Sequence, residues 1–247
     1  MINLNIKDTY INYVQYGKES GPDLVLLHGW GQNIEMMDPI GKRMQESYRI
    51  TIIDFPGFGQ SPEPNYGYTV YDYYELLSEL FKKLKIKKPI LIGHSFGGRI
   101  AMIYAANQQT TKLILLGAPF RRSNKKANLK LKILKIMKKI PIINLFEDYA
   151  KTKIGSRDYR NATPIMRKIL VNVINENLEH ILSKIKVPTI LIWGSNDAEV
   201  PLEEAKVMES IIPDAGLIVY EDCTHYAYLE RLDQTINVLN EFLKDVK

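Results

Sequence analysis

Cysteine is nearly absent from this sequence, and so are the apolar stretches that mark membrane proteins. The one cysteine, Cys223, leaves the 247-residue chain without an internal disulfide, which fits a reducing compartment. No apolar run approaches the length that spans a bilayer. The N-terminus has no apolar block behind a basic start, so we expect no signal peptide. Together these absences favour a cytoplasmic protein.

Acidic residues are absent from residues 121–139, where nine basic residues occur. The whole chain has 33 basic and 28 acidic residues, which gives a net charge of +5. Without this stretch, 24 basic residues face 28 acidic ones. Because the rest of the chain is mildly acidic, we do not expect a nucleic-acid partner.

Short apolar runs bounded by turn residues recur along the chain, as in strands buried on both faces of a parallel sheet. Two β-like stretches, 4–6 and 11–16, precede them, and the alternation in the second predicts an antiparallel edge pair. Apolar residues at helical spacing lie between most runs, and Thr69 is placed to cap one such helix. The pattern predicts an α/β fold with a doubly wound, mostly parallel sheet. The predicted core strands are 24–27, 50–53, 90–92, 113–116, 190–193 and 217–220, and the predicted helices include 71–84, 96–106 and 229–243.

The interval 120–186 breaks this rhythm, because it has several helical stretches and no convincing strand. It predicts a helical cap inserted between two core strands. Residues 1–119 and 187–247 would then form a single core domain, which suits a chain of this length. Within the insertion, residues 125–140 alternate lysines with apolar residues and predict a basic amphipathic helix.

A G-x-S-x-G pattern at 93–97 stands directly between a predicted buried strand and a predicted helix. A sharp turn there forces its central residue, Ser95, into a strained backbone, and the flanking glycines leave room for the turn. The turn would lift the serine oxygen clear of the sheet at a helix N-terminus. We therefore predict that Ser95 is a nucleophile. The alternative is a tight turn with an incidental serine.

A serine hydroxyl needs a base, and the sequence has four histidines. His225 follows the last predicted strand, so we expect it at the same carboxyl edge of the sheet as Ser95. The side chain of His94 should diverge from that of its neighbour Ser95. His28 follows the first core strand, and His180 falls in the insertion. We predict His225 as the base, with an ordinary surface-loop histidine as the alternative.

The base needs a carboxylate that holds it in one tautomer and stabilises its charged form. Asp197 lies in the loop after the penultimate strand, at the correct edge of the sheet. Glu199 is the nearest rival, and Asp222 is the next, although its position suggests a turn former. We predict Asp197 as the acid. Asp54 lies in a rigid loop rich in glycine, and we assign it a structural role.

Acyl transfer also needs donors for the oxyanion that develops on the carbonyl. The backbone N–H of Phe96, directly after the predicted nucleophile, is one candidate. The backbone N–H of Trp30, after the first core strand, is the other, and Gly29 lets the chain turn close to a substrate. The alternative is a glycine-rich turn with a core tryptophan.

Five segments together resemble the α/β-hydrolase superfamily: H-G-W-G at 28–31, D-F-P-G-F-G-Q-S at 54–61, G-H-S-F-G-G at 93–98, W-G-S-N-D at 193–197 and T-H-Y at 224–226. The chain order serine, aspartate, histidine also matches the family. The resemblance implies an eight-stranded sheet with a helical cap after the sixth strand. It also implies hydrolysis through an acyl-serine intermediate, with no cofactor and no bound metal.

Within the family, the likeness is to small esterases, carbon–carbon bond hydrolases and pimeloyl-carrier-protein methyl esterases. We hypothesise a carboxylic-ester hydrolase for a small-molecule substrate with a small or medium acyl group. The alternatives are a carbon–carbon bond hydrolase with the same residues, and a ligand receptor that turns over slowly or not at all. Family members that act on haloalkanes or epoxides use an aspartate where this chain has Ser95, so we exclude those activities.

The sequence says least about the substrate pocket and the cap. Arg121 and Arg122 would hold a carboxylate if they turn inward. The lysines of 125–140 either face water or form a docking face for an acidic carrier protein, an acidic substrate or an anionic membrane surface. The predicted substrate contacts are Gly29, Trp30, Phe120 and Phe146.

Overall fold

An eight-stranded sheet forms the centre of the protein, as a computed structural model of residues 2–6, 9–122 and 162–246 describes it. The strand order is β1-β2-β4-β3-β5-β6-β7-β8. The first two pairs, β1·β2 and β2·β4, are antiparallel, and every other pair is parallel. The prediction of a mostly parallel sheet with an antiparallel edge pair is confirmed. The strands are β1 Ile2–Ile6, β2 Thr9–Gly17, β3 Asp23–Leu27, β4 Arg49–Ile53, β5 Ile90–His94, β6 Lys112–Leu116, β7 Thr189–Gly194 and β8 Ala215–Tyr220.

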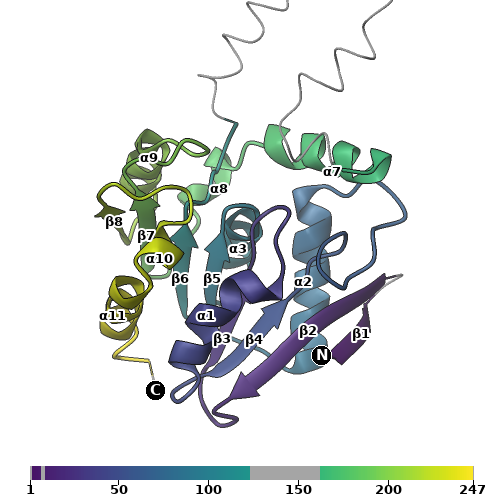
Figure 1. The fold of residues 1–247 in the computed structure, drawn as a ribbon, viewed down its shortest axis with the longest axis horizontal. Helices are drawn as coiled ribbons and strands as arrows, with labels where there is room; N and C mark the ends of the chain where they lie inside the picture. Colours follow the sequence, from purple (N-terminus) through teal and green to yellow (C-terminus); the bar gives the residue numbers. More distant parts are fainter. Residues whose placement is uncertain (1, 7–8, 123–161, 247) are drawn as a thin grey trace, which may run out of the picture.

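Helices cover both faces of the sheet (Figure 1). Alternate residues of the parallel strands point to opposite faces, so Val25 and Leu27 join one core cluster while Leu24 and Leu26 join the other. The first cluster includes residues of α2, α3, α7, α8 and α9, and the second includes residues of α1, α10 and α11. The helices are α1 Ile34–Met44, α2 Val70–Leu84, α3 Phe96–Asn107, α7 Pro164–Asn175, α8 Glu179–Leu182, α9 Leu202–Ile211, α10 Ala227–Glu230 and α11 Leu232–Phe242.

The helix boundaries follow local chemistry where the sequence supplies it. Thr69 caps α2 as predicted, since its hydroxyl accepts from the N–H of Asp72 while the Asp72 carboxylate accepts from the N–H of Thr69. The predicted helix 229–243 is wrong as a single element. It is divided between α10 and α11 at Arg231, whose backbone is not helical (φ −125°, ψ 50°). Apolar spacing does not reveal the break, because both helices bury residues in the same core cluster.

The interval between β6 and β7 contains α7 and α8 in its described part. Both helices lie beyond the carboxyl ends of the central parallel strands (Figure 1). The predicted basic helix at 125–140 lies outside the described residues, and the domain boundaries at 120 and 186 stay a prediction. Among the described helices, none is long and apolar enough to cross a membrane.

Candidate active site

The turn between β5 and α3 holds Ser95 in a rare backbone conformation, with φ 49° and ψ −110°. Glycines around it permit close approaches of the backbone. A Cβ at Gly97 would lie 2.4 Å from the carbonyl oxygen of Leu27, and a Cβ at Gly93 would lie 2.5 Å from the Cα of Gly98. The predicted strained turn is therefore present, and its strain is maintained by packing against β3.

Asp197 is buried and fixed by the loop that carries it. Its Oδ1 accepts backbone N–H groups of Glu199 and Val200, each at 2.8 Å. Its Oδ2 lies 2.8 Å from Nδ1 of His225. A carboxylate only accepts, so Nδ1 carries the proton and Nε2 of His225 is left as the acceptor, which is the tautomer that a general base requires.

The two rival carboxylates are exposed and do not share this geometry. Glu199 contributes its backbone N–H to Asp197. Asp222 is a turn residue with φ 61°, and its N–H donates to the hydroxyl of Ser195. In the described residues the carboxylate that contacts Nδ1 of His225 is that of Asp197.

Ser95 follows β5, and the ring of His225 lies beside Gly117, the residue after β6, which is the neighbour of β5 in the sheet. The N–H of Ser95 donates to Leu116 at the end of β6. Directly after Leu116, a Cβ at Gly117 would lie 3.1 Å from Nδ1 of His225. His94, the residue before Ser95, has its ring centroid 4.8 Å from that of His225. The fold thus brings the predicted nucleophile, base and acid to one edge of the sheet.

The segment after β3 is tied to the turn that carries Ser95. The N–H of Gly97 donates to the carbonyl of His28 at 3.0 Å. The Trp30 ring lies edge-to-face on Phe58 and Phe96, with centroids at 4.8 Å and 5.5 Å. Within the described part of the chain, no backbone carbonyl accepts from the N–H of Trp30 or of Phe96. Both amides are therefore available to an oxyanion.

The predicted substrate contacts have different positions. Gly29 is buried, and a Cβ there would lie 2.7 Å from Nδ1 of His94. Trp30 is half-buried and borders a cavity of about 680 Å³. Phe120 is completely buried in the core, and Phe146 lies outside the described residues. A substrate-binding role for each stays a prediction.

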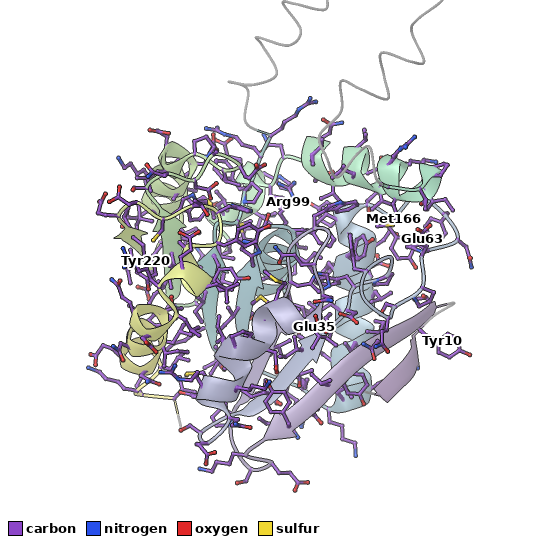
Figure 2. The ribbon with its side chains drawn as sticks, viewed as in Figure 1. Tyr10, Glu35, Glu63, Arg99, Met166 and Tyr220 are labelled. Atoms are coloured by element: carbon purple, nitrogen blue, oxygen red, sulfur yellow. The ribbon has the colours of Figure 1, made fainter. Side chains whose placement is uncertain are left out.

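The cavity beside Trp30 combines apolar and acidic lining. Glu35 comes from α1, Glu63 from the loop after β4, and Met166 from α7 (Figure 2). The exposed ring of Tyr226, directly after His225, also lines it. Of the predicted oxyanion donors, Trp30 borders this cavity.

His28 and Asp54 support the site without facing it. Nε2 of His28 accepts the N–H of Phe55 at 3.0 Å, and Nδ1 then donates to the carbonyl of Gly29 at 2.7 Å. Complete burial lowers the pKa of His28 to about 4. Asp54 accepts from the N–H of Ile34 at the start of α1 and from other donors around it, which agrees with the structural role assigned to it.

Three arginines connect segments within the interval between β6 and β7. Arg99 is buried and donates to the carbonyls of Pro119, shortly after β6, and Glu176, directly after α7 (Figure 2). Arg121 pairs with Glu179 and Glu204, and Arg122 donates to Asn175. The proposed substrate-carboxylate role of Arg121 and Arg122 stays a prediction, and in this structure both side chains have protein partners.

Side-chain contacts beyond the predicted set also shape the site. Oε1 of Gln32 accepts the N–H of Gly29 and also contacts Nδ1 of His94. Nε2 of His94 in turn contacts the backbone carbonyl of His225. Apolar periodicity carries no signal for such contacts. Within the described ranges, no group of three or more histidine, cysteine, aspartate or glutamate side chains is placed to hold a metal ion.

Comparison with known proteins gives concordant matches. A family model described as the alpha/beta hydrolase fold matches residues 22–140. Lipase 1 of Psychrobacter immobilis is 27% identical over 253 residues, which cover 93% of this chain and 79% of that protein. The pimeloyl-[acyl-carrier protein] methyl ester esterase of Aliivibrio fischeri is 24% identical, over 90% of this chain and 94% of that protein.

A solved structure agrees with these sequence matches. The esterase from Exiguobacterium antarcticum superposes with a TM-score of 0.77 at 25% identity, covering 98% of this chain and 99% of that chain. The superposition covers nearly the whole of both chains. It therefore confirms the fold predicted from the sequence.

Proposed function

This chain has the α/β-hydrolase fold, and from that premise we propose that it hydrolyses a carboxylic ester through an acyl-serine intermediate. Its relatives include proteins named as esterases and lipases. The substrate class proposed is a small molecule with a small or medium acyl group. Trp30 and the adjoining cavity of about 680 Å³ support that size.

Catalysis begins at Ser95. Its Oγ attacks the ester carbonyl carbon while Nε2 of His225 takes the hydroxyl proton. The imidazolium then gives that proton to the oxygen of the leaving alcohol, and the carbon–oxygen bond to the alcohol breaks. A water molecule, activated in turn by His225, attacks the acyl-serine, releases the acid and restores the hydroxyl of Ser95.

The imidazolium and the oxyanion that form during this reaction both have partners in the protein. Asp197 stabilises the imidazolium through the 2.8 Å contact with Nδ1 of His225. The amides of Phe96 and Trp30 receive the oxyanion. The observation that carries the proposal is the Asp197–His225 hydrogen bond at the sheet edge where the strained turn presents Ser95.

The test is turnover of p-nitrophenyl acetate and p-nitrophenyl butyrate. We expect wild-type turnover, and a loss of at least about 10³-fold in Ser95→Ala, because the remaining groups cannot supply a nucleophile. Ser210→Ala changes an exposed serine on α9 and should leave turnover unchanged. Equal turnover in wild type and Ser95→Ala would contradict the proposal. So would a stoichiometric burst of p-nitrophenol without turnover, which favours a receptor.

A carrier-linked methyl ester is the finer candidate substrate. The supporting observation is the match to pimeloyl-[acyl-carrier protein] methyl ester esterases of Aliivibrio, which covers 90% or more of this chain. Methanol release from a pimeloyl methyl ester on acyl carrier protein should then exceed release from the same acyl group on a free thiol. Equal methanol release from the two esters would contradict the carrier-linked substrate and leave the small-molecule ester as the proposed one.

A further inference from the structure

His94 lies where the three parts of the site meet. It ends β5 directly before Ser95, and its side chain is completely buried. Nε2 lies 3.1 Å from the backbone carbonyl oxygen of His225. Nδ1 lies 3.1 Å from Oε1 of Gln32, in the segment that contains Trp30. One imidazole thus contacts both the segment of the base and the segment of the oxyanion donors.

The partners of His94 decide where its proton resides. A neutral imidazole has one N–H, and both of its neighbours are acceptors. Oε1 of Gln32 already accepts the N–H of Gly29 at 3.0 Å. For the carbonyl of His225, His94 is the donor that the described residues provide. The proton is therefore needed at Nε2, because a buried carbonyl without a donor is costly.

The ring also fixes the chain that follows His225. Its centroid lies 5.4 Å from that of Tyr226 and 4.9 Å from that of Tyr228. Tyr228 is itself buried and donates to Met36 of α1. His94 therefore contacts three residues of one short segment. Its ring packs against Tyr226 and Tyr228, and it contacts His225 both by ring packing and by a hydrogen bond.

We propose that His94 is a positioning residue, whose Nε2–H holds the backbone carbonyl of His225 and so fixes the imidazole of the base relative to Ser95. The inference rests on the proposed ester hydrolysis and adds a residue to it. Asp197 holds the ring of His225 from one side, and His94 holds its backbone from the other. Together they restrict the ring to one placement over the sheet edge.

A neutral His94 is part of this role. Burial, followed by the charge of His225, lowers the pKa of His94 to about 3. A cation at this position would repel the imidazolium that forms on His225 during each proton transfer. The uncharged donor positions the base without opposing its protonation.

The test uses two amides that differ by one methylene. The side-chain nitrogen of Gln reaches the position of Nε2, whereas that of Asn reaches only the position of Nδ1. We expect His94→Gln to keep kcat for p-nitrophenyl butyrate within about threefold of wild type. His94→Asn should lower kcat about 10- to 100-fold with KM within about threefold, since a displaced base affects the chemical step more than binding.

Controls separate positioning from folding and from the proposed function. His180→Gln changes an exposed histidine and should leave kcat unchanged. The thermal midpoints of the Asn and Gln variants should agree within a few degrees, so that the difference in kcat is not a difference in folding. Equal kcat in the two variants, whether high or low, would overturn the inference.

The proposed function fails in a different way. If turnover persists in Ser95→Ala, the ester-hydrolysis proposal is wrong, whatever the His94 variants do. If turnover depends on Ser95 while His94→Asn equals His94→Gln, only the role of His94 is wrong. A rise in KM with unchanged kcat in His94→Asn would also overturn it, because it would indicate a role in binding.

Discussion

The side chain of Ser95 is attached to a backbone that suits glycine better. With φ 49° and ψ −110°, its Cβ is held in a region that costs L-residues about 1–3 kcal/mol. The hydrogen bond from its N–H to Leu116 and the packing of Gly97 against β3 maintain this conformation. The proposed nucleophile is therefore also a strained residue.

Replacing Ser95 by glycine should separate stability from activity. Ser95→Gly removes the Cβ, whereas Ser95→Ala keeps it, and both remove the proposed nucleophile. We expect the free energy of unfolding of Ser95→Gly to exceed that of Ser95→Ala by about 1 kcal/mol. Glycine releases the backbone strain, and its greater entropy in the unfolded state offsets part of that gain. Urea unfolding at pH 7 measures the difference. A less stable glycine variant would show that the turn is not strained.

At the scale of the element, α3 approaches β3 more closely than a side chain permits. A Cβ at Gly97 would lie 2.4 Å from the carbonyl oxygen of Leu27 and 2.6 Å from that of His28. Both are backbone atoms, which cannot move aside as the end of a flexible side chain does. The first turn of α3 is therefore specified by glycine for packing as well as for the bend at Ser95.

An alanine at Gly97 should destabilise the protein by at least about 2 kcal/mol, because overpacking here must displace backbone. Gly216 in β8 is the matched control, since a Cβ there meets nothing within 4 Å. We expect Gly216→Ala to change the free energy of unfolding by less than about 0.5 kcal/mol. Thermal and urea unfolding of both variants measure this. Equal effects at the two glycines would be inconsistent with the close approach.

Elements were predictable where one local signal dominates. Each buried core strand is a short apolar run, and each lies within one or two residues of its predicted range. Helix α1 is an addition to the predicted elements, because Pro39 within it interrupts a helical pattern. The break at Arg231 was not predictable from apolar spacing, since the residues on both sides bury toward the same face.

At the scale of the whole molecule, the sheet positions the residues of the candidate site. Ser95, Asp197 and His225 follow β5, β7 and β8, and strands that run in parallel bring their carboxyl ends to one edge. Chain order and strand assignment were therefore enough to predict that these residues lie at the same edge of the sheet. The contacts of His94 with Gln32 and His225 were not predictable, because they depend on ring orientation at a scale of about an ångström, which sequence order does not specify.

Buried neutral histidine makes the stability of the whole protein depend on pH. The pKa of His28 falls from its ordinary 6.5 to about 4 through burial. Between these values the unfolded chain binds more protons than the folded one, so stability is complete above about pH 6.5 and is lost as pH falls toward 4. The loss from His28 alone is about 3 kcal/mol.

Urea unfolding at pH 7, 6 and 5 measures this dependence. We expect the free energy of unfolding to decline steadily over that range, before most carboxylates titrate. His180→Gln should show the same decline as wild type, because that histidine is exposed. A free energy that is constant from pH 7 to pH 5 would mean that His28 does not remain neutral in the folded protein.

The hydrogen bonds of Arg99 to Pro119 and Glu176 place the start of the inserted interval beside the residues between α7 and α8, and the bond from the N–H of Leu178 to the carbonyl of Phe120 adds to this closure. A segment that leaves and rejoins a scaffold at one point can change in length or content without altering the spacing of the strands that carry it. The interval can therefore vary, and with it the proposed substrate preference, while the strands that carry Ser95, Asp197 and His225 keep their spacing.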